Sequence, residues 1–249
     1  MASQVTLAIV GGTGFERLAH FEDKELVSLD TPFGAPSNAI VIGNLFGKRV
    51  CFLSRHGDGH VIPPHLINYR ANMHALKQLG AEQVIAINAV GGISPLMGPR
   101  HICIPNQLID YTWGREHTYA VGDGAPVNHI DFTCPYDKQI RRRLISAAES
   151  VDMDFSPVGT YGCTQGPRLE TAAEIDRLDR DGCDIVGMTG MPEAALAKEL
   201  ALQYACIALI VNRAAGRGTR EITLDEINAN LEKGANNIYY LIREYLAAQ

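Results

Sequence analysis

The sequence is best understood from the segment Val84-Ile85-Ala86-Ile87-Asn88-Ala89-Val90-Gly91-Gly92. Its β-branched residues and the glycine pair at its end predict a strand buried on both faces, which is typical of a parallel sheet covered by helices. Ligands of such sheets bind beyond the carboxyl ends of the strands. We expect the strand to stop at Asn88-Ala89 and the glycines to turn the backbone closely around a ligand, so that this turn forms the floor of a pocket.

The composition predicts one large domain over residues 1–249. The chain has 249 residues, of which 46% are hydrophobic and 20% are charged, so it is long enough for a substantial core. We find no linker, repeat or low-complexity run that would divide it. The net charge of −6 argues against a nucleic acid or an anionic membrane as partner, because both require a basic surface. A small anionic ligand needs only local positive charge.

The cysteines and the amino terminus indicate a cytoplasmic protein. The six cysteines are widely spaced and form neither a Cys-x-x-Cys pair nor a Cys/His cluster at zinc spacing, which predicts buried free thiols and no metal site. The first apolar run lacks the basic segment of a secretory signal, and no segment reaches membrane-spanning length.

Strands and helices follow one another in the order expected of an α/β fold. The predicted strands lie at residues 5–10, 38–42, 48–53, 84–89, 102–104, 184–187 and 206–211. The predicted helices lie at 66–79, 138–151, 171–182 and 192–204, and a terminal helix starts at the capping box Thr223-x-x-Glu226. The helix at 66–79 connects two strands into a βαβ unit.

Groups that bind anions follow several of these strands. Gly11-Gly12-Thr13-Gly14 is a glycine turn whose amides and hydroxyl can hold an anion. Arg55-His56 leads into a second glycine turn, where the guanidinium offers paired donors to a phosphate dianion and the imidazole another. The Asn88-Ala89 turn and Thr189 add further donors. A dinucleotide fingerprint is the weaker interpretation of the first turn, because Arg17 stands where its third glycine is required.

Other strand ends and loops offer groups suited to a neutral ligand. Glu170 lies at a loop-to-helix junction, where it serves either as a partner of the helix dipole or as an acceptor in a pocket. Asn212 ends the strand at 206–211. The long segment 107–135 is typical of a functional loop or a contact between subunits. No serine, cysteine or lysine lies beside a base as an obvious covalent nucleophile, and a reaction in which bound phosphate itself attacks would need none.

These motifs resemble those of the trimeric purine nucleoside phosphorylase and methylthioadenosine phosphorylase family. The resemblance spans nearly the whole chain and rests on Gly11-Gly12-Thr13-Gly14, Ser54-Arg55-His56-Gly57, Asn68-Tyr69-Arg70-Ala71-Asn72, Gly166-Pro167-Arg168, Met188-Thr189-Gly190-Met191-Pro192-Glu193 and the Asn212 loop. It implies a single α/β domain with a central mixed, largely parallel sheet flanked by helices. It also implies a homotrimer that cleaves a purine nucleoside with inorganic phosphate as co-substrate and without a cofactor.

The resemblance assigns roles to individual positions. The residues that it implies in phosphate binding are Thr13, Arg55, His56, Asn88, Ala89 and Thr189. The residues that it implies in nucleoside binding are Met188 at the ribose and Ala89, Val90, Gly91, Leu169, Glu170, Asn212 and Ala214 around the base. Leu169 stands where both branches of the family have an aromatic residue. Asn212 and His56 are the implied catalytic residues, and Asn212 is placed to relieve the charge at N7 of the departing purine.

The base and the sugar distinguish the branches of the family. The amide of Asn212 can donate to O6 of a 6-oxopurine and accept from N7, while Glu170 accepts N1–H; methylthioadenosine phosphorylases have aspartate and serine at these two positions. Ile222 and Leu224 align with apolar residues of a 5′-methylthio pocket, and His129 aligns with a histidine that reaches it from the adjacent subunit. The combination predicts phosphorolysis of S-methyl-5′-thioinosine to hypoxanthine and 5-methylthioribose 1-phosphate.

Three alternatives stay open at this point. An inosine and guanosine phosphorylase, or a methylthioadenosine phosphorylase, would share most of these motifs. A nucleoside- or phosphate-binding regulatory protein would share the anion-binding strand ends without catalysis. A dehydrogenase or methyltransferase fold is disfavoured by the missing third glycine.

Overall fold

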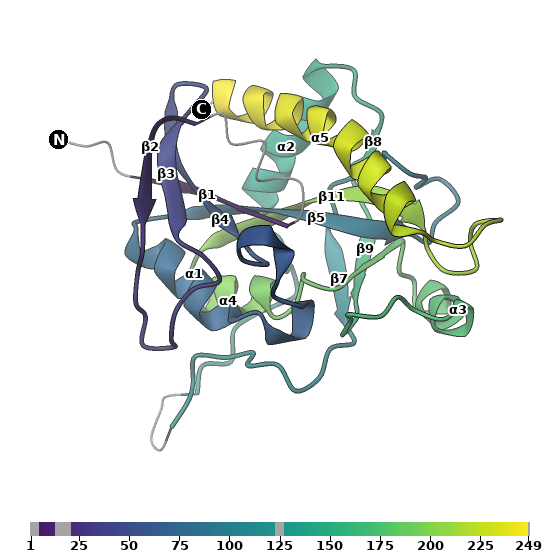
Figure 1. The fold of residues 1–249 in the computed structure, drawn as a ribbon, viewed down its shortest axis with the longest axis horizontal. Helices are drawn as coiled ribbons and strands as arrows, with labels where there is room; N and C mark the ends of the chain where they lie inside the picture. The colour runs from purple at the N-terminus through teal and green to yellow at the C-terminus, as the bar shows by residue number, and fades with distance from the viewer. Residues whose placement is uncertain (1–4, 13–20, 123–126, 249) are drawn as a thin grey trace.

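A mixed sheet lies between two layers of helices in the computed structural model, which describes residues 5–12, 21–122 and 127–248 (Figure 1). Helices α1 (Tyr69–Gln78) and α4 (Glu193–Glu199) cover one face of the sheet. Helices α2 (Lys138–Ser150) and α5 (Leu224–Ala247) cover the other face, and α3 (Ala172–Arg180) lies at one flank. No helix of the described residues is both long and apolar enough to cross a membrane.

Four parallel strands form the middle of the sheet. In spatial order they are β4 (Lys48–Ser54), β1 (Leu7–Gly11), β5 (Gln83–Gly92) and β11 (Gln203–Arg213). Beyond β4 the sheet continues antiparallel with β3 (Ile40–Leu45) and β2 (Glu22–Val27). Past the end of β1, the same edge of β5 pairs with β10 (Ile185–Gly187), beside which lie β9 (Thr160–Cys163) and β7 (Gln107–Asp110), while β6 (Ile102–Cys103) and β8 (Phe155–Ser156) extend from β11.

The central strands are buried on both faces because successive side chains point into two different cores. In β5, Val84 and Ala86 belong to the core that contains the side chains of α1 and α4. Ile85 and Ile87 belong to the core that contains those of α2 and α5. The prediction of a strand that starts near Val84 and is buried on both faces is therefore confirmed.

Strand β5 changes its neighbour halfway along, and this change positions the site. Residues 83–86 pair with β1, whereas Gly91 and Gly92 pair with β10, which runs antiparallel to β5. On its other edge β5 pairs with β11 along its whole length. Within the described residues no strand pairs with 87–90 on the first edge, and Ala89 is the one exposed residue of β5. The sheet is thus open beside Asn88 and Ala89.

Two predicted boundaries are wrong. The strand does not stop at Asn88-Ala89 but continues through Gly92, and glycine is required there because a Cβ at Gly92 would overlap the Met97 carbonyl oxygen. The helix expected at 192–204 ends at Glu199, because Ala201 adopts a left-handed φ of 54° and the Leu202 N–H bonds back to the Ala197 carbonyl at 2.9 Å. Residues 203–204 already belong to β11.

The other local predictions fare better. Thr171 caps α3 and exchanges hydrogen bonds with Glu174 in a full capping box, although none was predicted there. At the predicted box of α5, the Thr223 side chain accepts from the Glu226 N–H. All six cysteines are free thiols, and all but Cys134 are buried.

Candidate active site

A cleft of about 250 Å³ opens beside β5 where the sheet changes strands. This volume is just below the ~300–1,000 Å³ range of small-molecule pockets, so the cleft suits a small ligand. The predicted site residues that line it are Arg55, His56, Asn88, Ala89, Val90, Gly91, Leu169, Glu170, Met188, Thr189, Asn212, Ala214 and Ile222. Residues from five separate segments of the sequence are therefore brought together as predicted. No group of His, Cys, Asp or Glu among the described residues could hold a metal ion.

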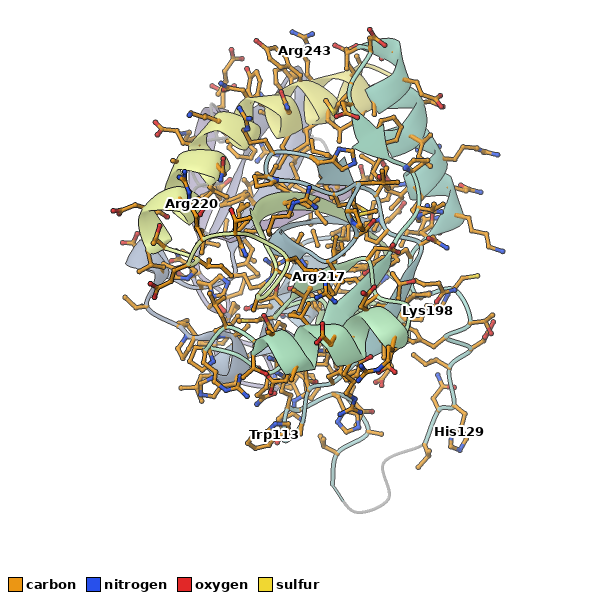
Figure 2. All side chains as sticks on the ribbon, turned by 90° about the vertical axis from the view of Figure 1, so that its right-hand side faces the viewer. Trp113, His129, Lys198, Arg217, Arg220 and Arg243 are labelled. Atoms are coloured by element: carbon orange, nitrogen blue, oxygen red, sulfur yellow. The ribbon has the colours of Figure 1, made fainter. Side chains whose placement is uncertain are left out.

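Three predicted residues are not found in this cleft. Thr13 lies outside the described residues. Leu224 is 76% exposed at the start of α5, and Ile227, one turn further on, lines the cleft instead. His129 is exposed on the segment that projects from the body of the chain, so it does not reach the cleft of its own chain (Figure 2). The helical spacing of Leu224 and Ile227 is the signal that could have identified the second residue.

Arg55 is held by a buried carboxylate. Its Nε and Nη2 donate to the two oxygens of Glu193 at 2.6 and 2.8 Å, and both side chains are at most 1% exposed. The Tyr204 hydroxyl donates to the same carboxylate at 2.9 Å. Although burial alone disfavours a charged guanidinium, the Glu193 carboxylate raises the pKa of Arg55. The paired donors expected to bind phosphate are therefore already engaged, and the pair places no net charge at this end of the cleft.

One nitrogen of Arg55 keeps a donor. Its Nη1 donates to the Ile87 carbonyl at 3.3 Å, and a terminal guanidinium nitrogen carries a second N–H. A Cβ placed on Gly12 would lie 3.9 Å from Nη1, so this nitrogen faces the turn that follows β1. Arg55 can thus give a ligand one donor rather than two.

His56 presents an acceptor to the cleft. Its Nδ1 lies 2.8 Å from the Ile62 carbonyl oxygen, which can only accept, so Nδ1 carries the hydrogen and Nε2 carries a lone pair in the neutral ring. Burial and, after it, the positive charge of Arg55 lower the pKa of His56 to about 4. The ring is therefore neutral at pH 7. The ring therefore offers phosphate an acceptor at Nε2, whereas the sequence predicted that the imidazole would donate a hydrogen bond.

Asn88 connects Arg55 to a buried tyrosine. Its Oδ1 accepts from Arg55 Nη2 at 3.2 Å, and its Nδ2 donates to the Tyr161 hydroxyl at 3.4 Å. The Thr189 N–H donates to the same hydroxyl at 3.5 Å. A Cβ on Gly187 would overlap that hydroxyl, so glycine is needed there. Thr189 follows β10 as predicted, and because β10 runs antiparallel to β5 it brings Thr189 toward Asn88.

The orientation of the Asn212 amide is fixed by its neighbour. Asn212 is 6% exposed, and its Nδ2 donates to the Arg213 carbonyl oxygen at 2.7 Å. Because a carbonyl only accepts, the amide nitrogen must face Arg213. One N–H of Nδ2 and the lone pairs of Oδ1 remain for a ligand. An ionised aspartate at this position would place a carboxylate oxygen against the Arg213 carbonyl oxygen, and both of these atoms only accept hydrogen bonds.

Glu170 is held from one side. The Thr164 hydroxyl donates to its Oε1 at 2.6 Å, and the side chain lines the cleft, which favours the predicted pocket acceptor over a helix-dipole partner. Leu169 stands beside it at the rim and is 42% exposed. Arg168 binds Glu174 of α3 with two hydrogen bonds of 2.7 and 2.8 Å, which anchors the far end of this loop.

Arg115 is a buried residue of the site that sequence reasoning missed. It is 8% exposed and donates to the carbonyls of Thr164 at 3.2 Å, Gln165 at 2.8 Å and Met188 at 2.8 Å. It also donates to the Met191 carbonyl. The long segment 107–135 therefore ties together the two loops that carry Glu170 and Thr189, and the length of that segment was the only signal of its role.

Comparison with known proteins identifies the family. A family model described as the phosphorylase superfamily matches residues 6–247. The chain belongs to this superfamily. The probable S-methyl-5′-thioinosine phosphorylase of Pseudomonas syringae pv. tomato is 54% identical over 241 residues, covering 97% of this phosphorylase and 98% of its relative. The 6-oxopurine nucleoside phosphorylase of Pyrococcus furiosus is 44% identical, with 95% and 90% covered.

Solved structures agree with this assignment. The methylthioadenosine phosphorylase from Schistosoma mansoni in complex with adenine has a TM-score of 0.92 and 31% identity, covering 98% of this phosphorylase and 91% of that chain. The predicted family, the α/β fold with a mixed sheet flanked by helices, and the prediction of a phosphorylase are confirmed.

Proposed function

We propose that this phosphorylase cleaves 6-oxopurine nucleosides with inorganic phosphate, and that S-methyl-5′-thioinosine is its preferred substrate. The observation that carries the proposal is the Asn212 amide, whose nitrogen is directed by the Arg213 carbonyl in the same cleft as Glu170. The remaining N–H of Nδ2 donates to O6, and Glu170 accepts from N1–H. Oδ1 accepts from N7–H once the departing base has taken up a proton from water at N7. The names of the relatives from Pseudomonas syringae and Pyrococcus furiosus support this choice of base.

Adenine nucleosides meet the opposite pattern of donors and acceptors. The 6-amino group would face the amide N–H of Asn212, and the bare N1 would face a carboxylate. Each buried mismatch costs about 1–3 kcal/mol. The solved relatives bound to adenine show that the fold accepts adenine when its base pocket is built for it.

Phosphate binds at the other end of the cleft, largely through neutral groups. The Arg55–Glu193 pair contributes no net charge, so the donors are the second N–H of Arg55 Nη1, the Thr189 hydroxyl and the open backbone of β5 at Ala89. The neutral His56 accepts the P–OH of hydrogen phosphate through Nε2, which leaves the charged oxygens for the donors and for the sugar. No protein cofactor takes part.

The reaction is a displacement at C1′ of the ribosyl group. The bond from C1′ to the purine nitrogen breaks, its electron pair leaves with the base, and an oxygen of phosphate bonds to C1′. Contacts of Asn212 at N7 stabilise the negative charge that the base acquires in the transition state. Burial raises the pKa of Cys163, a thiol in contact with the Met191 loop, to about 12, so phosphate rather than a thiolate is the nucleophile.

A substrate panel tests the function directly. Purified protein should release hypoxanthine from S-methyl-5′-thioinosine only when phosphate is present, and arsenate should replace phosphate. Inosine that reacts as fast as S-methyl-5′-thioinosine would indicate a general 6-oxopurine nucleoside phosphorylase instead. Equal release in phosphate-free buffer would indicate a hydrolase and contradict the proposal.

The 5′ end of the cleft is completed by a second copy of the chain in a homotrimer. Ile222 and Ile227 give it an apolar wall, which suits a methylthio group better than a hydroxyl. His129 projects away from its own cleft and is available to a neighbour (Figure 2). Exposed Trp113, Val127 and Leu224, which are 72%, 73% and 76% exposed, are further apolar groups that such an interface would cover.

Mixed oligomers test this arrangement. The His129→Ala and Asn212→Ala variants should each be nearly inactive alone. In the first, every cleft lacks the histidine of the neighbouring copy, and in the second, every cleft lacks its own Asn212. Co-expressed, they should regain activity, since some clefts combine Asn212 of one copy with His129 of the next. A fully active monomer in light scattering, or no recovery in the mixture, would contradict the trimer.

A further inference from the structure

Glu170 stands between two hollows of the molecule. A second hollow of about 500 Å³ lies behind the cleft, on the side of α3, and its lining includes Thr112, Trp113, Thr164 and Arg168. Figure 2 faces this side and shows Trp113 below α3. Among the described residues, Glu170 is the one that lines both hollows. Its side chain therefore has space on either side.

One hydroxyl group holds this carboxylate in place. The Thr164 hydroxyl donates to Glu170 Oε1 at 2.6 Å, a length typical of a hydrogen bond to a charged oxygen. Within the part of the chain that the structure describes, no other side chain hydrogen-bonds to Glu170. On the far side, Arg168 lines the second hollow, and its positive charge interacts with Glu170 as well as with Glu174, to which its guanidinium is hydrogen-bonded.

Thr164 itself is fixed on every side. Its N–H donates to the Gly187 carbonyl at 2.8 Å, and its own carbonyl accepts from Arg115 Nη2 at 3.2 Å. Its hydroxyl also lies 3.3 Å from the Gly187 carbonyl oxygen. A β-branched side chain has little rotational freedom. The hydroxyl is thus a rigid anchor for an otherwise movable carboxylate.

We propose that Thr164 is a positioning residue that sets the selectivity between 6-oxopurine and 6-aminopurine nucleosides. This inference rests on the proposed function, in which Glu170 accepts N1–H. By occupying Oε1, the hydroxyl directs Oε2 toward the base. Without the hydroxyl, Glu170 turns toward Arg168. A 6-oxopurine then loses the carboxylate that accepts its N1–H. A 6-aminopurine loses a carboxylate that is mismatched with its bare N1.

Three variants test this role. Thr164→Val removes the hydroxyl and keeps the shape, Thr164→Ser keeps the hydroxyl, and Thr112→Val is the matched control. Thr112 lines the same hollow, but its hydroxyl donates to Asp110 at 2.7 Å. We expect Thr164→Val to lower kcat/KM for S-methyl-5′-thioinosine about tenfold or more, the loss typical of a hydrogen bond to a charged group. S-methyl-5′-thioadenosine should change less than about twofold, and the Ser and Thr112 variants should keep the wild-type ratio.

A double-mutant cycle separates positioning from stability. In a Glu170→Gln background, Thr164→Val should leave the ratio of the two substrates unchanged, because the carboxylate that it positions is gone. An equal loss for both substrates in both backgrounds would make Thr164 merely structural and overturn the proposal. Should Thr164→Val fail to fold, Thr164→Ala is measured in the same way.

The wild-type data tell the two proposals apart. A wild-type enzyme that prefers 6-aminopurines, or that needs no phosphate, would contradict the proposed function. A wild-type enzyme that prefers 6-oxopurines, joined to a Thr164→Val enzyme with an unchanged ratio, would overturn the role of Thr164 alone.

Discussion

The two ends of the cleft are built in different ways. At the phosphate end, Arg55 and Glu193 form an ion pair that is at most 1% exposed, and Asn88 is 2% exposed. At the base end, Leu169 is 42% exposed and Glu170 depends on one hydroxyl. One end is closed into the core, whereas the other can rearrange.

The difference assigns separate tasks to the two ends. A rigid, charge-balanced end binds the same co-substrate in every cycle and so determines the type of reaction. An adaptable end with few contacts can be altered without loss of the fold, so it determines which nucleoside is used. Substitutions at the phosphate end should therefore change stability most, and substitutions at the base end should change selectivity.

The largest effect is expected from Glu193→Gln. The variant leaves the Arg55 charge buried without a counter-ion, which should lower the free energy of unfolding by about 3–5 kcal/mol. Urea unfolding without phosphate measures the loss, and added phosphate should stabilise the variant more than the wild type. Glu199→Gln, in the same helix, is the control, because among the described residues its side chain accepts one hydrogen bond, from the Tyr119 N–H. A loss below about 1 kcal/mol would show that the ion pair is not essential.

The second largest effect is expected from acid, which should lower the free energy of unfolding through His56 at the phosphate end. Because the pKa of His56 is lowered from 6.5 to about 4, the unfolded chain takes up a proton between these values and the folded chain does not. The free energy of unfolding should therefore fall as the pH drops from about 6.5 to 4, by about 3 kcal/mol from this residue. His56→Gln should remove that part of the pH dependence. Parallel curves for variant and wild type would contradict a buried neutral His56.

The smallest effect is expected at the rim of the base end. Leu169→Phe restores the aromatic residue of related enzymes at a position that is 42% exposed. An aromatic contact with the purine adds about 0.5–1.5 kcal/mol to the free energy of nucleoside binding, so KM should fall about two- to tenfold. The free energy of unfolding should change little. A rise in KM would show that Leu169 packs against the base in a way that a ring cannot.

The sequence predicted well what depends on local pattern. The burial of β5 on both faces, the strand ends with Arg55 and Asn212, and the start of α3 at Thr171 all follow from a few neighbouring residues. The partner of Arg55 could not be predicted, because Glu193 lies 138 positions away along the chain. The direction of β10 relative to β5 could not be predicted either, because a strand of three residues carries no directional signal.

Arg115 shows a different limit of sequence analysis. Apart from the Gln165 side-chain oxygen, its acceptors in both cleft loops are backbone carbonyls. Every residue has such a carbonyl, so no side-chain pattern identifies the partners. The tautomer of His56 was missed for the same reason, since the Ile62 carbonyl determines it.

The central claim, that the directed amide of Asn212 selects a 6-oxopurine, is tested most directly by one ratio. The measurement is kcat/KM for S-methyl-5′-thioinosine divided by that for S-methyl-5′-thioadenosine, in the wild type and in Asn212→Asp. Asn230→Asp is the control, because the Asn230 amide also donates to a β11 carbonyl, that of Val211 at 2.9 Å, and does not line the cleft. We expect a wild-type ratio of about 100 or more, a loss of at least about tenfold in Asn212→Asp, and no change in the control. A wild-type preference for S-methyl-5′-thioadenosine, or an unchanged ratio in Asn212→Asp, would contradict the claim.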